Sequence, residues 1–248
     1  LSFSVYYPIL NHHFMIDDFE FTNINRLSAV FPSWTDYFTK SYTRHYIPLY
    51  NFLITRLFYI FHVAKPFYLL NILLIFLASF LHYIFISQLT RQWRLALLTA
   101  VLYIVHPMNA EIIQHVNNPT FLASIFAQLG LISLNRTFEH NQKILNYSLS
   151  LICFVIALLM HEVLALFPLY VFALLRFRFH HLKTIFKIMI PYILVGLTHM
   201  IFWFHIVGSN ARLTQNLQHS NLDLWTYTAG LSRVIFWYIK GLFFPHNI

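Results

Sequence analysis

Charge is scarce in this sequence of 248 residues. Only 10% of the residues are Asp, Glu, Lys or Arg, whereas 58% are hydrophobic and 19% are aromatic. Soluble globular domains carry roughly 25% charged and 45–50% apolar residues. The composition therefore excludes an ordinary soluble domain and favours a polytopic α-helical membrane protein.

Cysteine is almost absent, and internal repeats are absent altogether. Cys153 is the only cysteine and lies within an apolar run, so the chain forms no intramolecular disulfide. The lack of a repeated unit excludes a solenoid. Because the chain does not begin with Met and opens on an apolar stretch too short to cross a bilayer, we expect a fragment whose first helix is cut. Residues 1–248 then form a single transmembrane domain.

Long apolar runs, by contrast, are plentiful. A hydrocarbon core of about 30 Å is crossed by a helix of about 17–25 residues, so the runs predict an all-α bundle with seven to eight spans. The first outer loop, about 11–65, is expected to carry short interfacial helices, because the run 47–64 has Arg56 at its middle. The expected spans are 66–89, 95–107, 119–134, 144–160, 163–176, 186–207 and 224–244, with 1–10 as the tail of an earlier one.

The basic residues are concentrated in three short loops, 90–94, 135–143 and 176–187. These loops hold eight of the 16 Lys and Arg residues. By the positive-inside rule the loops are cytoplasmic. The formal charge of +8 is thus a topology signal and does not indicate a nucleic-acid partner.

Acidic residues follow the opposite distribution, with seven of the eight on or beside the outer face that this topology predicts. Asp and Glu contribute little to membrane orientation, so their position needs another cause. Three outer segments stand out: the pair Asp17 and Asp18, "HPMNAE" at 106–111 and "MHE" at 160–162. Ionisable groups at membrane depth are costly, which makes these segments candidates for one shared site.

Each of these segments also has a plainer structural explanation. The acidic pair could be a solvated loop with a helix-capping Asp. The histidines at 12 and 13 raise the possibility of a metal, but adjacent residues rarely bind one ion, and no metal ligand is assigned. The "HP" at 106–107 could be a helix end, and "MHE" could be a polar turn between two spans. A zinc protease is excluded, because the second His of its motif would fall at Ala165.

Taken in order, several segments resemble the membrane domain of the GT-C glycosyltransferases. They are "NHHFMIDDFEFTNI", "RHYIPLYNFLITRLFYIF", "YLLNILLIFLASFLHYIF", "LALLTAVLYIVHPMNAEIIQHV" and "LLMHEVLALFPLYVFAL". Within that superfamily the chain is most similar to the tetratricopeptide-repeat-containing transmembrane O-mannosyltransferases and their bacterial relatives. The resemblance covers roughly residues 5–176, and the tetratricopeptide repeats themselves are not in this chain.

The resemblance implies an inverting, mannosyltransferase-like enzyme of the bacterial inner membrane or the endoplasmic reticulum membrane. Such an enzyme moves a sugar from a polyprenyl-phosphate donor to a protein hydroxyl, a glycan or a lipid on the periplasmic or luminal face, and a divalent cation could assist. Asp17 is then the expected general base, with Asp18 as its helper. The residues expected around the donor phosphate are His106, Glu111, His161, Glu162, Arg44 and Arg56.

The chain departs from the family pattern at three expected cations. Ile47 stands where the family has Arg, "NN" at 117–118 replaces Gly-Arg, and His161 replaces Lys. These departures leave open a catalytically inactive relative of the enzymes. A transporter or lipid-handling protein is the other alternative, although its polar residues would be expected near the bilayer midplane.

Overall fold

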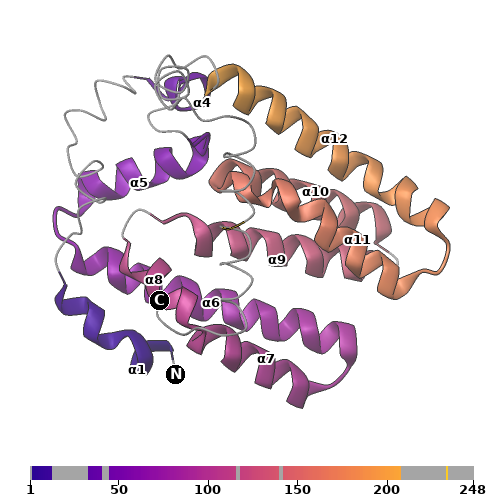
Figure 1. Cartoon of the computed structure of the whole chain (residues 1–248), viewed down its shortest axis with the longest axis horizontal. Coiled ribbons are helices and arrows are strands. Elements are labelled where there is room, and N and C mark those ends of the chain that lie inside the picture. The colour runs from indigo at the N-terminus through magenta and orange to yellow at the C-terminus, as the bar shows by residue number, and fades with distance from the viewer. Residues whose placement is uncertain are drawn as a thin grey trace.

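The computed structural model of this chain describes residues 2–12, 33–40, 45–115, 118–139, 142–207 and 233. Every element within these residues is a helix, which confirms the all-α fold class. The elements, shown in Figure 1, are α1 (Ser2–Tyr6), η1 (Tyr7–Asn11), α4 (Asp36–Thr39), α5 (Pro48–Ile60), α6 (Lys65–Thr90), α7 (Trp93–Val105), α8 (Pro107–Gln114), α9 (Thr120–Thr137), α10 (Lys143–Met160), η3 (Glu162–Leu166), α11 (Phe167–Arg178) and α12 (Leu182–Ile206).

Within the described residues, three helices are long and apolar enough to cross a membrane. These are α6 with 26 residues, α10 with 18 and α12 with 25. Their boundaries agree with the expected spans 66–89, 144–160 and 186–207 to within four residues at each end. A fourth span is obtained only if α7 and α8, which meet at a bend of 48°, are counted together. The structure is consistent with a membrane protein.

The expected number of seven to eight spans is not supported. The run 163–176 forms the short η3 and then α11, whose 12 residues rise only about 18 Å. The run 119–134 forms α9, but the last turn of α9 is Asn135, Arg136 and Thr137, which shortens its apolar stretch. The run 1–10 forms only the short α1 and η1, and the run 224–244, apart from residue 233, lies outside the described residues. Apolar runs were predicted correctly as helices, but several are too short or too polar to span.

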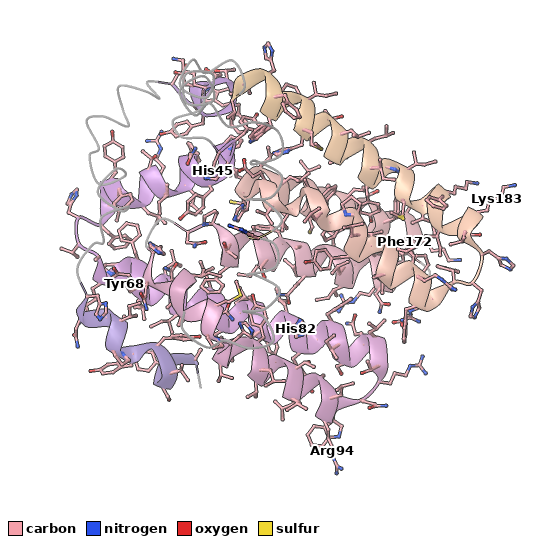
Figure 2. All side chains as sticks on the ribbon, viewed as in Figure 1. His45, Tyr68, His82, Arg94, Phe172 and Lys183 are labelled. Atoms are coloured by element: carbon pink, nitrogen blue, oxygen red, sulfur yellow. The ribbon has the colours of Figure 1, made fainter. Side chains whose placement is uncertain are left out.

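The longer helices run back and forth along one direction. In Figure 1 the links from α6 to α7 and from α11 to α12 lie on the right, and the starts of α6 and α9 lie on the left. Lys183 marks the right-hand end in Figure 2, whereas His45 and Tyr68 lie toward the left. Two of the predicted cytoplasmic loops, 90–94 and 176–187, therefore share one end of the bundle.

An aromatic and aliphatic core holds the later helices together. Phe154 of α10, Phe167 of α11 and Tyr192 of α12 are fully buried and contact one another through their rings. At Gly130, α9 approaches α10 so closely that a Cβ would lie 3.3 Å from the backbone oxygen of Ser150. The missing side chain thus permits tight packing, as small residues do between membrane helices.

A chain of hydrogen bonds crosses the same region. The hydroxyl of Tyr192 donates to Oγ of Ser150 at 2.8 Å, and Ser150 donates to the carbonyl oxygen of Gly130 at 2.7 Å. Ser150 is completely buried. Three helices, α9, α10 and α12, are therefore joined by polar groups inside the apolar bundle.

The membrane orientation can be tested by cysteine labelling. In a Cys153→Ala background, a cysteine at Lys183, beside the α11–α12 link, should resist an impermeant thiol reagent in intact cells. A cysteine at Val63, which is 60% exposed beyond the end of α5, should react. Both sites should react after the membrane is permeabilised. The opposite labelling pattern would place the basic loops outside and overturn the predicted topology.

Candidate functional site

The junction after α10 positions the candidate site. α10 ends at Met160, and His161 adopts an extended backbone conformation with φ −154° and ψ 118°. Nδ1 of His161 then accepts a hydrogen bond at 3.5 Å from the backbone N–H of Val163, at the start of η3. This sharp change of direction turns Glu162 away from the axis of α10 and toward neighbouring elements.

Glu162 is the centre of a polar cluster that joins three parts of the chain. Its Oε1 lies 2.5 Å from Nδ1 of His45, which precedes α5. Its Oε2 accepts hydrogen bonds from the backbone N–H of Tyr46 at 3.0 Å and from the indole N–H of Trp203, in α12, at 2.9 Å. Figure 2 shows His45 at the end of α5 nearest to α10 and α12. We call His45, Tyr46, Glu162 and Trp203 the Glu162 cluster.

Within the Glu162 cluster, Glu162 and His45 favour their ionised forms. Burial by itself would raise the pKa of Glu162, but the hydrogen bonds from His45, Tyr46 and Trp203 outweigh burial and leave that pKa below its ordinary value. The hydrogen bond to Glu162 raises the pKa of His45, although partial burial opposes the rise. Both directions favour a carboxylate beside an imidazolium. The side chain of His45 remains 58% exposed and that of Glu162 only 21%.

Two neighbouring histidines complete the surroundings. Burial lowers the pKa of His161, which favours its neutral form although Glu162 is adjacent. On the other side, the ring of His199 in α12 lies 5.6 Å from the ring of Tyr46. The Glu162 cluster, with its carboxylate, cationic imidazole and aromatic rings of Tyr46 and Trp203, thus lies beside the neutral imidazole of His161.

The pair between His45 and Glu162 should make stability depend on pH in a known direction. Because the folded-state pKa of His45 is raised, the pair contributes fully below the ordinary His pKa of about 6.5 and is lost as pH rises through the raised value. The lowered pKa of Glu162 means that its contribution is lost only in acid, as pH falls through that value. We expect the unfolding temperature of the purified protein to fall slightly between about pH 6 and about pH 9.

The corresponding change in the free energy of unfolding should be below about 1 kcal/mol, because solvent screens a pair in which His45 is more than half exposed. His45→Gln should flatten this part of the pH profile, whereas His62→Gln, at an exposed histidine beyond α5, should not. An unchanged profile in His45→Gln would mean that the pair is not ionised as described.

Several residues predicted for the site lie outside the described residues. These are the expected base Asp17, its helper Asp18, and Arg44. Glu111 lies within α8, where the structure describes the backbone. The structure therefore does not test whether the acidic pair meets the Glu162 cluster, and those assignments stay predictions.

The remaining predicted residues are found in three different settings. His161 and Glu162 are consecutive residues at the junction after α10. His106 separates α7 from α8, and its Nδ1 accepts a hydrogen bond at 3.3 Å from the backbone N–H of Met108, so it caps α8. The exposed guanidinium of Arg56 lies over the ring of Phe52, 5.3 Å from its centroid, on the same helix α5. Capping and ring contact are structural roles, and neither places these two residues in the Glu162 cluster.

Sequence reasoning missed the partners of Glu162. His45 lies between Arg44, which was predicted for the site, and Ile47, where the chain departs from the family pattern, but His45 itself was not singled out. Trp203 and His199 lie inside a run that reads as an ordinary span. The nearby His199 could have been found from its residue type, since histidine is rare in a helix of this hydropathy, whereas Trp203 gives no such signal.

The described residues contain no group of three or more His, Cys, Asp or Glu side chains that could hold a metal ion. No family model, no curated protein and no solved structure matches the chain.

Proposed function

We propose that this chain is the membrane part of a glycosyltransferase that takes a sugar from a polyprenyl-phosphate donor. The observation that carries the proposal is the contact of Glu162 with His45 and Tyr46. It brings together two of the segments that resemble the GT-C enzymes, "RHYIPLY" and "MHE", which are more than 100 residues apart. They meet at the end of the bundle away from Lys183 (Figure 2), as expected if the site lies on the outer face.

The proposed reaction needs a base and a place for the leaving phosphate. The acceptor hydroxyl attacks the anomeric carbon of the donor sugar and gives its proton to Asp17, while the bond from that carbon to the phosphate oxygen breaks. Polyprenyl phosphate leaves with the bonding electrons, and the configuration of the sugar is inverted. Asp18 orients the base or the acceptor.

The Glu162 cluster offers a cation where the family arginine is missing. Ile47 occupies the expected arginine position, and His45 lies two residues before it. Glu162 favours the protonated form of His45, and the largely exposed imidazolium can contact an anionic group from the aqueous side. We therefore assign His45 to binding of the donor phosphate, with Glu162 as the residue that positions it and maintains its charge.

The test is a donor turnover assay with the purified protein in lipid vesicles. Release of polyprenyl phosphate from a panel of polyprenyl-phosphate sugars, including the mannose form, should exceed that of empty vesicles. His45→Gln should raise the KM for the donor more than it lowers kcat, and the raised KM should lose the native pH dependence. His62→Gln is the matched control and should behave as the native protein. No turnover of any donor by the native protein would refute the proposal in favour of an inactive relative.

A further inference from the structure

We propose that the groove between α10 and α12 binds one membrane lipid that is uncharged and carries a hydroxyl group, with that hydroxyl bonded to His199. This proposal does not rest on the proposed sugar transfer. The groove has a volume of about 370 Å³, within the range of sites that hold small molecules. Its walls include Leu158 and Leu159 from α10 and Leu194 and Phe202 from α12, and Tyr46 lines it as well.

His199 is the feature that identifies a ligand. Its side chain lines the groove and is only 7% exposed. Its Nε2 is buried and has no hydrogen-bond partner in the part of the chain that the structure describes. Leaving such a group unpaired destabilises a protein, so a ligand that reaches it gains a hydrogen bond that the protein does not supply. A hydroxyl both donates and accepts, and can pair with Nε2 in either tautomer.

The other polar groups of the groove are already engaged. The hydroxyl of Thr198 donates to the carbonyl oxygen of Leu194 at 2.9 Å, and that of Tyr46 donates to the carbonyl oxygen of Phe38 at 3.1 Å. Neither hydroxyl therefore needs a hydrogen bond from a ligand. Apart from His199, the remaining described residues that line the groove are aliphatic or aromatic. One polar contact at one position, with a long apolar wall, matches a hydrocarbon chain or ring system that has a single hydroxyl.

Charge argues against an anionic lipid. No Lys or Arg is among the described residues that line the groove. The carboxylate of Glu162 lies next to it, because Tyr46 both lines the groove and donates its backbone N–H to Glu162. A phosphate at His199 would find no free cation among the described residues that line the groove, and the imidazolium of His45 is already paired with Glu162.

The groove is open to the bilayer. α10 and α12 are two of the helices able to span a membrane, and the rim residues Leu194 and Phe202 are 57% and 52% exposed. His199 lies about 10 Å from the end of α12 at Ile206, taking 1.5 Å per residue. This shallow depth suits a lipid hydroxyl near the membrane surface, with its chain directed inward along α10 and α12.

Photocrosslinking tests the site directly. The full chain is placed in phosphatidylcholine vesicles with a long-chain alcohol that carries a diazirine, and the labelled peptides are identified. We expect labelling of α10 and α12 that is reduced by unlabelled alcohol and much less by the alkane of equal length. His199→Leu should weaken competition by the alcohol about three- to tenfold, the effect of one neutral hydrogen bond. His205→Leu removes an exposed histidine of the same helix and should change nothing.

Two further variants protect the test against misfolding. Leu194→Trp keeps His199 but fills the groove, and should abolish the labelling of α10. His199→Gln restores a hydrogen-bonding group and should recover part of the preference for alcohol over alkane. The proposal is overturned if the alkane competes as well as the alcohol, since the groove would then hold any chain. It is also overturned if an alkyl phosphate competes better, or if His199→Leu retains the native preference.

Discussion

Asp17→Asn is expected to lower the turnover of a polyprenyl-phosphate sugar by about 10²- to 10⁴-fold, the usual loss when a general base is removed. Asn nearly preserves the shape and hydrogen bonding of Asp, but its amide is far too weakly basic to accept the proton of an attacking hydroxyl. The loss should therefore appear in kcat, with donor binding nearly unchanged. Donor turnover at saturating donor concentration is the measurement.

Two other Asp→Asn substitutions are to be compared with Asp17→Asn. Asp18→Asn should cost less, because Asp18 is proposed only to orient its neighbour or the acceptor. Asp36→Asn changes a carboxylate that is occupied by Lys40 and Ser33, and activity should remain native. Native activity in Asp17→Asn would refute the assignment of the base. Native activity in the Asp17, Asp18 double variant would remove the proposed site altogether.

Glu162→Ala is expected to give the largest loss of stability, about 1–3 kcal/mol in the free energy of unfolding. The substitution leaves the backbone N–H of Tyr46 and the indole N–H of Trp203 without their acceptor and leaves His45 without its carboxylate. It therefore disconnects the segment before α5 from α12. Chemical unfolding of the purified protein in detergent measures the change.

The comparison is with Glu139→Ala at the other end of the bundle. Glu139 also forms an ion pair, with Arg178, but Arg178 additionally donates two hydrogen bonds to Asn135 and keeps that partner. The loss should be within about 1 kcal/mol, as for an ordinary partly exposed pair. The side chain in Glu162→Gln can still accept hydrogen bonds from the two N–H groups, so the stability of this variant should lie between those of the native and Glu162→Ala proteins. Equal stability of the native and Glu162→Ala proteins would mean that the cluster does not hold the elements together.

The fold was predictable where a single physical quantity decides it. The runs at 66–89, 144–160 and 186–207 are long and apolar, so the boundaries of α6, α10 and α12 follow closely from hydropathy. The number of spans was not predictable in this way, because it depends on where each helix ends. Pro107 begins a new helix after α7, and the turn at 161–162 leads into η3 before α11 begins. Apolar composition alone does not show such breaks.

The candidate site was predictable only in part, for a related reason. Glu162 stands out because a carboxylate between apolar runs is costly. Its partners do not stand out, since His45 and Trp203 are 117 and 41 residues away and no local pattern relates them. Hydrogen bonds across such separations depend on how helices pack, which a single sequence does not state. His199 is similar, because its burial depends on α10 lying beside α12.

The hydrogen bonds from Tyr192 to Ser150 and from Ser150 to Gly130 have a consequence for the distant end of α10. They fix the angle at which this helix is rotated about its own axis, because Ser150 must face α9 and α12 together. Each residue of a helix turns by about 100°. A one-residue insertion or deletion between Ser150 and Met160 would therefore direct Glu162 about 100° away from His45 and Trp203. Ser150 therefore determines the direction in which Glu162 points, although the two residues are not in contact.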